Sequence, residues 1–117
     1  RMRIIMTPID DQALTALQGL LKARFNVVLE KYIEESDSLL GQLQPAKQSQ
    51  DDELMIRIVH SLKSSSRNLG ANELSDLSGE LEEAVKNGQY DEFEASTQKL
   101  QSLYEDVKSY LQTNYLH

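Results

Sequence analysis

The sequence has 117 residues, which fits one domain that can bury a hydrophobic core. It contains no cysteine, which excludes a disulfide framework, a thiolate metal site and a thiol nucleophile. The net charge of −7 disfavours nucleic acid as a partner, and no apolar run approaches the roughly 18 residues of a membrane span. Residues 1–6 are too short, and too soon followed by Pro8, to be a signal peptide, so we expect a cytoplasmic protein.

The first half of the chain predicts two helices. Thr7 as a cap and Pro8 at the first helical position predict a short helix over 8–21. Apolar residues at spacings of three and four then predict a strongly amphipathic helix over 24–44. Pro45 is expected to stop that helix, and the polar stretch 44–52 to form a connecting loop.

The second half predicts three more helices. Asp51 or Asp52 can cap a helix over 52–69, which Gly70 ends. Asn72 is expected to cap the next helix, which ends at the pair 87–88, and the last helix runs over 89–114 before a fraying end at 115–117. No strand alternation appears. The fold class is therefore all-α: an antiparallel four-helix bundle with a short extra N-terminal helix, in a single domain over 1–117 with its core in about 8–114.

His60 is the residue that does not fit a plain bundle. In a helical projection it points roughly 140° away from the apolar stripe of its helix, so its ring is expected to face water. Lys63, Ser64 and Arg67 follow it on the same outward stripe, and Arg57 precedes it by one turn. The result is a local basic strip on an acidic protein.

An exposed imidazole beside basic side chains suits the arrival of an anion. A neutral imidazole nitrogen is a competent nucleophile toward phosphorus, and Lys63 would lie close enough to bond phosphoryl oxygens. The alternative is plain: a lone exposed histidine on a helix is often only a surface residue. Arg57 and Arg67 could equally pair with nearby carboxylates, and such surface pairs contribute little.

The stretch from His60 to Ala71 has the sequence HSLKSSSRNLGA. It closely resembles the signature of the histidine phosphotransfer (HPt) domain family, His-x-Leu-Lys-Gly-small-small-x-x-Leu-Gly-Ala, and the resemblance continues through Leu81-Glu82. The chain looks like the stand-alone bacterial members of this family. Ser64 departs from the usual glycine, and Ser78 stands where cysteine is frequent.

The resemblance implies a function and a set of partners. His60 would be the phospho-acceptor and Lys63 would assist, in a phosphotransfer intermediate of a two-component phosphorelay that is not an enzyme with its own kinase site. The phosphoryl group would come from an aspartate of one receiver domain and pass to an aspartate of another, and the implied partners are response-regulator receiver domains and a hybrid sensor histidine kinase. No cofactor is expected on this chain, because Mg²⁺ would be bound by the receiver.

Docking of a receiver needs apolar side chains near the histidine. Ile56 is the best candidate on the same helix, and Leu14 or Leu21 are possible additions from the first helix, although each leucine could simply be core. We expect a monomer, and the self-contained length favours a free-standing protein over a domain cut from a sensor kinase.

Two other functional classes stay open. The chain could be a non-catalytic helical adaptor or scaffold that is indifferent to His60. It could also be a small hydrolase or phosphatase. That hypothesis is the weakest, because the sequence offers no metal-ligating set and no second histidine near a serine for a triad.

Overall fold

The computed structural model describes residues 7–116, so the expectation about residues 1–6 and the position of His117 lie outside the described part. The described residues are almost entirely helical and contain no strand, which confirms the all-α prediction. The elements in chain order are α1 (Asp11–Leu21), the 3₁₀ helix η1 (Lys22–Arg24), α2 (Phe25–Gln48), α3 (Asp52–Asn68), α4 (Asn72–Lys86) and α5 (Phe93–Asn114).

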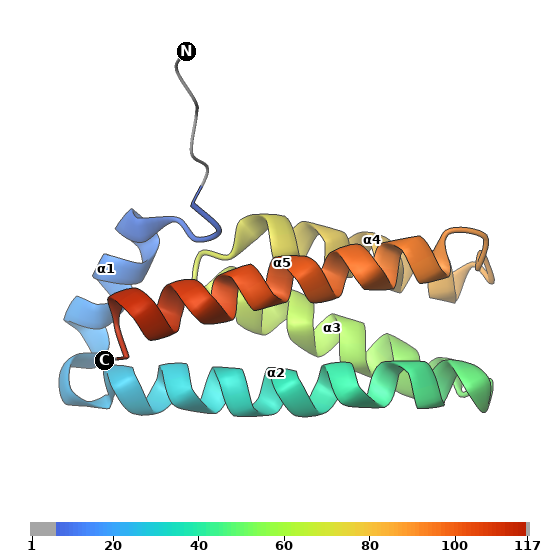
Figure 1. Ribbon diagram of the computed structural model, residues 1–117, viewed down its shortest axis with the longest axis horizontal. Coiled ribbons are helices and arrows are strands. Elements are labelled where there is room, and N and C mark those ends of the chain that lie inside the picture. Colours follow the sequence, from blue (N-terminus) through green and yellow to red (C-terminus); the bar gives the residue numbers. More distant parts are fainter. Residues whose placement is uncertain (1–6, 117) are drawn as a thin grey trace, which may run out of the picture.

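Helices α2 to α5 run back and forth as a four-helix bundle, and α1 lies across the end at which α2 begins and α5 ends (Figure 1). Short connections between successive long helices impose the antiparallel order. Helices α3 and α4 make the most extensive contact of any pair. The candidate site lies along this α3–α4 contact.

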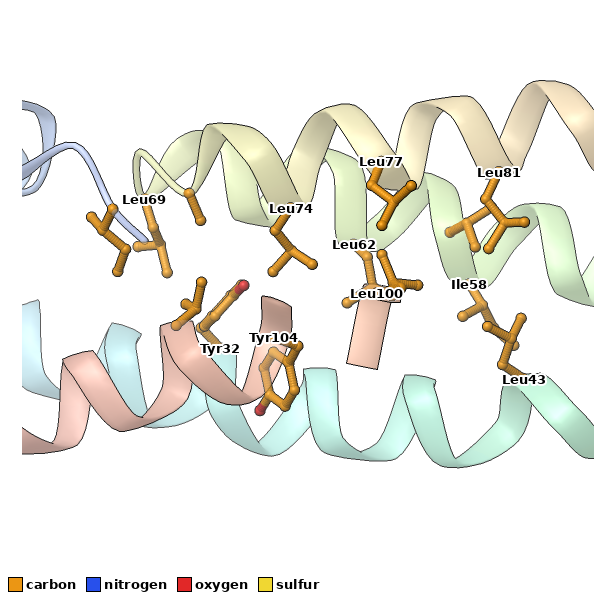
Figure 2. Close-up of a cluster of buried hydrophobic side chains, with 14 of the residues drawn as sticks. Tyr32, Leu43, Ile58, Leu62, Leu69, Leu74, Leu77, Leu81, Leu100 and Tyr104 are labelled. Carbon is orange, nitrogen blue, oxygen red and sulfur yellow. The ribbon is translucent and has the colours of Figure 1, made fainter. Parts of the chain in front are cut away.

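The core runs along the bundle axis and receives side chains from every long helix. Figure 2 shows leucines of α3 and α4 pointing toward Leu100 of α5 and toward the rings of Tyr32 and Tyr104. Several of these side chains are fully buried. The apolar stripe expected on the third helix is buried as expected, and its members are Met55, Ile58, Val59, Leu62, Ser66 and Leu69.

The start of α1 differs from the prediction. Asp10, not Thr7, is the N-cap, and its carboxylate accepts hydrogen bonds from the backbone N–H groups of Gln12 and Ala13. The helix therefore begins at Asp11 rather than at Pro8. An aspartate caps as well as a threonine does, so sequence alone could not choose between the two positions.

Pro45 does not stop α2, which continues through it to Gln48. Proline removes one backbone donor and crowds the carbonyl four residues earlier, here that of Gly41. Gly41 is exposed, so water can take the place of the lost donor. Beyond the proline, Ala46 is buried in the core, and this packing holds the last turn in helical form.

Two helix starts and the C-terminal end also differ from the prediction. Asn72 is the first residue of α4 rather than its cap, which is Ala71 and makes no side-chain bond. Helix α5 begins at Phe93, four residues later than predicted. Tyr115 is ordered against the body, with its ring 5.8 Å from that of Phe25, so the prediction of fraying is wrong for this residue.

Candidate functional site

His60 lies in the middle of α3 with its side chain 57% exposed. The neighbouring Val59 and the residues one half-turn away, Ile58 and Leu62, are completely buried and fix this helix in the bundle. The backbone under His60 is therefore rigid while its imidazole stands at the surface. This is the outward orientation that the helical projection of α3 predicts.

A buried carboxylate binds one edge of the imidazole. Nδ1 of His60 lies 2.9 Å from Oε2 of Glu82, which is on α4 and only 4% exposed. Two ammonium groups share the same carboxylate: Lys63 Nζ is 2.9 Å from Oε1, and Lys86 Nζ is 3.1 Å from Oε2. Glu82 therefore joins three basic side chains from α3 and α4 into one cluster, which we call the Glu82 cluster.

The charge of Glu82 is strongly stabilised. Burial alone raises the pKa of this carboxyl, but the hydrogen bonds from Lys63, Lys86 and His60 outweigh burial and lower the pKa to about 2. Glu82 is therefore ionised at neutral pH, and an ionised carboxylate can only accept hydrogen bonds. For the neutral imidazole it follows that Nδ1 carries the proton and donates it to Glu82.

This tautomer decides which ring nitrogen is reactive. With the proton on Nδ1, the lone pair of the neutral ring is on Nε2. No residue between 7 and 116 forms a hydrogen bond with Nε2, and the ring is the exposed member of the pair. The site therefore presents one nucleophilic nitrogen to solvent, oriented by a buried base. That is the arrangement of an activated nucleophile with its orienting group.

The other predicted site residues are placed less favourably. Arg67 donates to Asp76 of α4 at 2.6 Å, so the alternative of simple surface pairing is correct for this residue. Arg57 is exposed and forms no ion pair with any residue in the range 7–116. Ser64 is exposed one turn after His60 and leaves the ring accessible. The continuous basic strip expected from the sequence is thus partly neutralised.

The candidate docking residues differ in how far they are buried. Leu14 is completely buried, so its proposed docking role is wrong: it is a core residue that fixes α1 to the bundle. Ile56 is half-buried one turn before His60. Leu21 is also half-buried and lines an apolar groove between α1, α2 and α3 together with Leu17, Val28, Tyr32 and Leu69.

Glu82 and Lys86 were not identified as site residues from the sequence. Both lie on α4, the helix after the one that carries His60. Glu82 is buried beside Leu81, a position at which a charge is unusual. The spacing of four between Glu82 and Lys86 was the available signal, since such pairs share a helix face. Neither observation could point to His60 without the packing of α4 on α3.

The helices of the described part include no candidate membrane span, because none is both long and apolar enough to cross a bilayer. Between residues 7 and 116, the side chains of His, Asp and Glu form no group of three or more that could hold a metal ion.

Comparisons with known proteins bear on the family and the fold of the chain. The Hpt domain family matches residues 27–110 of the chain. Among solved structures, the chain is similar to histidine-containing phosphotransfer protein B (HptB) from Pseudomonas aeruginosa PAO1, with a TM-score of 0.88 and 26% sequence identity over 93% of this chain and 95% of that one. A search of curated proteins gave no match.

Proposed function

The chain belongs to the Hpt domain family, whose members carry phosphoryl groups in phosphorelays, and from this premise we propose that His60 is its phospho-acceptor. One observation carries the proposal. The imidazole is exposed, and its Nδ1 is bound to a buried, ionised Glu82, so that Nε2 is the nitrogen available for attack.

The transfer step follows from this orientation. The Nε2 lone pair attacks the phosphorus of an aspartyl phosphate on a receiver domain, forming an N–P bond while the P–O bond to the aspartate breaks and its carboxylate leaves. The ring gains positive charge and keeps its proton on Nδ1. Glu82 accepts that N–H and stabilises the charge as it forms. Attack by a second receiver's aspartate on the phosphorus reverses the sequence.

Lys63 is proposed to stabilise the phosphoryl oxygens during transfer. Its ammonium lies at the site already, 2.9 Å from Oε1 of Glu82, and its side chain is 37% exposed, so it can contact both the carboxylate and an incoming group. Lys86 reaches the other carboxylate oxygen from the next turn of α4 and adds positive charge on the same side. Together the two lysines offset the charge of Glu82, which would otherwise repel a phosphate.

The proposed partners are receiver domains, one as donor from a hybrid sensor histidine kinase and one as acceptor in a response regulator. The Mg²⁺ that such transfers need would be bound by the receiver. Leu21, in the apolar groove, and Ile56, one turn before His60, remain the proposed apolar contacts of a docked receiver. A modest, partly polar interface would suit a partner that must dissociate after each transfer.

The proposal is tested with a His60→Gln variant. Purified receiver domains, phosphorylated with radiolabelled acetyl phosphate in the presence of Mg²⁺, are mixed with the wild-type chain, with His60→Gln and with His117→Gln, which removes the other histidine of the sequence. We expect acid-labile label on the wild type and on His117→Gln, and none on His60→Gln. Labelling of a folded His60→Gln variant would exclude His60 as the acceptor.

A Lys63→Ala variant separates the roles of the two residues. A hydrogen bond to a charged group contributes about 1.5 kcal/mol, which corresponds to about tenfold in rate. Transfer to Lys63→Ala should therefore be slowed about tenfold but not abolished. If no phosphorylated receiver from a broad panel labels the wild-type chain, the alternative of a non-catalytic helical adaptor gains support instead.

A further inference from the structure

Lys63 follows a defined path across the α3–α4 contact. Its backbone carbonyl accepts a hydrogen bond from the hydroxyl of Ser75 at 2.7 Å, and its ammonium is at Glu82, two turns further along α4. Ser75 is completely buried. The two ends of the lysine are therefore both bound to α4, and its aliphatic stem must run along the surface of that helix between them.

Gly79 lies on α4 between Ser75 and Glu82, directly under this stem. A Cβ atom added at Gly79 would sit 3.1 Å from Cδ and 3.9 Å from Cγ of Lys63, closer than ordinary van der Waals contact for the first of these. No atom of any other residue of the described chain, apart from the local helix backbone and chain neighbours, comes within 4 Å. The lysine stem thus occupies the space that any other residue type would need.

The backbone gives no separate reason for a glycine here. Positive φ angles among the glycines occur at Gly70 and Gly88, not at Gly79, so an L-residue could adopt this conformation. In a helix interior glycine is less favourable than alanine. A glycine at this position therefore weakens α4, and what it provides in return is the close passage of Lys63.

We propose that Gly79 is a positioning residue that holds the ammonium of Lys63 in the Glu82 cluster by letting the lysine stem lie flat against α4. This inference rests on the proposed role of Lys63 in transfer to His60. A Cβ at position 79 would push the stem outward by a few tenths of an ångström or force another rotamer. Either change lengthens the 2.9 Å contact between Lys63 and Glu82.

The test is a Gly79→Ala variant compared with Gly41→Ala. Gly41 is also inside a helix, and a Cβ there would meet nothing within 4 Å, so this control carries the same change in helix propensity without the contact. We expect Gly79→Ala to slow transfer about threefold, half of the tenfold effect of Lys63→Ala on a free-energy scale, while Gly41→Ala keeps the wild-type rate. Gly41→Ala should melt no lower than the wild type, and Gly79→Ala should still fold and unfold cooperatively.

A double variant shows whether the effect passes through the lysine. In a Lys63→Ala background the stem is absent, so Gly79→Ala should have no further effect on transfer. A further slowing of transfer by Gly79→Ala in the Lys63→Ala variant would refute the proposal. A wild-type transfer rate for the single variant Gly79→Ala would also refute it. Failure of Gly79→Ala to fold would also refute it, because the added Cβ would then be meeting more than a flexible side chain.

A second readout does not depend on phosphotransfer. NMR titration of the Glu82 side-chain carboxyl carbon measures a pKa that hydrogen bonds from Lys63, Lys86 and His60 hold near 2. Moving Lys63 away should raise this pKa in Gly79→Ala and leave it unchanged in Gly41→Ala. If His60→Gln still accepted label, the proposed function would fail while this titration could still support the positioning role. An unchanged Glu82 titration in Gly79→Ala would refute the positioning role alone.

Discussion

Replacing Glu82 by glutamine should reveal how much the buried carboxylate contributes to stability. The pKa of Glu82 is lowered from its ordinary 4.5 to about 2. This shift means that the folded protein favours the ionised over the neutral carboxyl by about 3 kcal/mol more than the unfolded chain does. Glutamine has nearly the same shape as the protonated acid and carries no charge. The free energy of unfolding of Glu82→Gln at pH 7 should therefore be about 3 kcal/mol lower than that of the wild type.

The pH dependence has a definite sign. Because the pKa of Glu82 is lower in the folded state, its contribution is fully present above pH 4.5 and is lost as the pH falls toward 2. At pH 3 about 1 kcal/mol of the contribution remains. The wild type should consequently lose about 2 kcal/mol more than Glu82→Gln between pH 7 and pH 3.

The measurement is urea unfolding of both proteins at the two pH values, followed by circular dichroism. Glu83→Gln is the matched control, since Glu83 is an exposed neighbour on the same helix that forms no ion pair within residues 7–116. It should follow the wild type at both pH values. If wild type and Glu82→Gln lost stability in parallel, the ionised carboxylate would not be the stabilising group, and the assignment of the His60 tautomer would lose its basis.

Two further predictions concern the frame around the site. Gly70→Ala should destabilise the fold by about 1–3 kcal/mol in urea unfolding, because Gly70 has φ +84° and an added Cβ would sit 3.0 Å from the backbone oxygen of Asp10. An unchanged unfolding midpoint would contradict this. Tyr104→Phe should lower the free energy of unfolding by about 1–2 kcal/mol, because the hydroxyl donates to the carboxylate of Asp37 at 2.7 Å and lies 3.0 Å from the carbonyl oxygen of Ile33. A thermal melt like that of the wild type would show that these hydrogen bonds add nothing to stability.

Much of the fold followed from local patterns because the signals were redundant. Each long helix carries an apolar stripe of several turns, and one misread cap changes a boundary without changing the helix. Pro45 shows the limit of this reasoning. Its local preference was to end α2, but the burial of Ala46 against the core outweighed the loss of one backbone hydrogen bond, and tertiary packing is not visible in a local pattern.

The site was predictable only where one helix determines it. His60 and Lys63 share α3, so a projection of that helix placed both near the surface. Glu82 belongs to α4, and its approach to His60 depends on how two helices pack, which no periodicity encodes. Leu14 failed for the same reason: whether a leucine on a short helix faces the core or a partner depends on the docking of that helix against the bundle.

The attachment of α1 has a consequence for how the molecule opens. Asp11, at the start of α1, accepts hydrogen bonds from the phenols of Tyr110 and Tyr115, at the far end of the chain. The ring of Tyr115 also packs edge-on against Phe25, at the start of α2. Local unfolding of α1 therefore has to break contacts with the end of α5 and the residue that follows it. Amide exchange should report these two segments as a single cooperative unit, although about a hundred residues separate them.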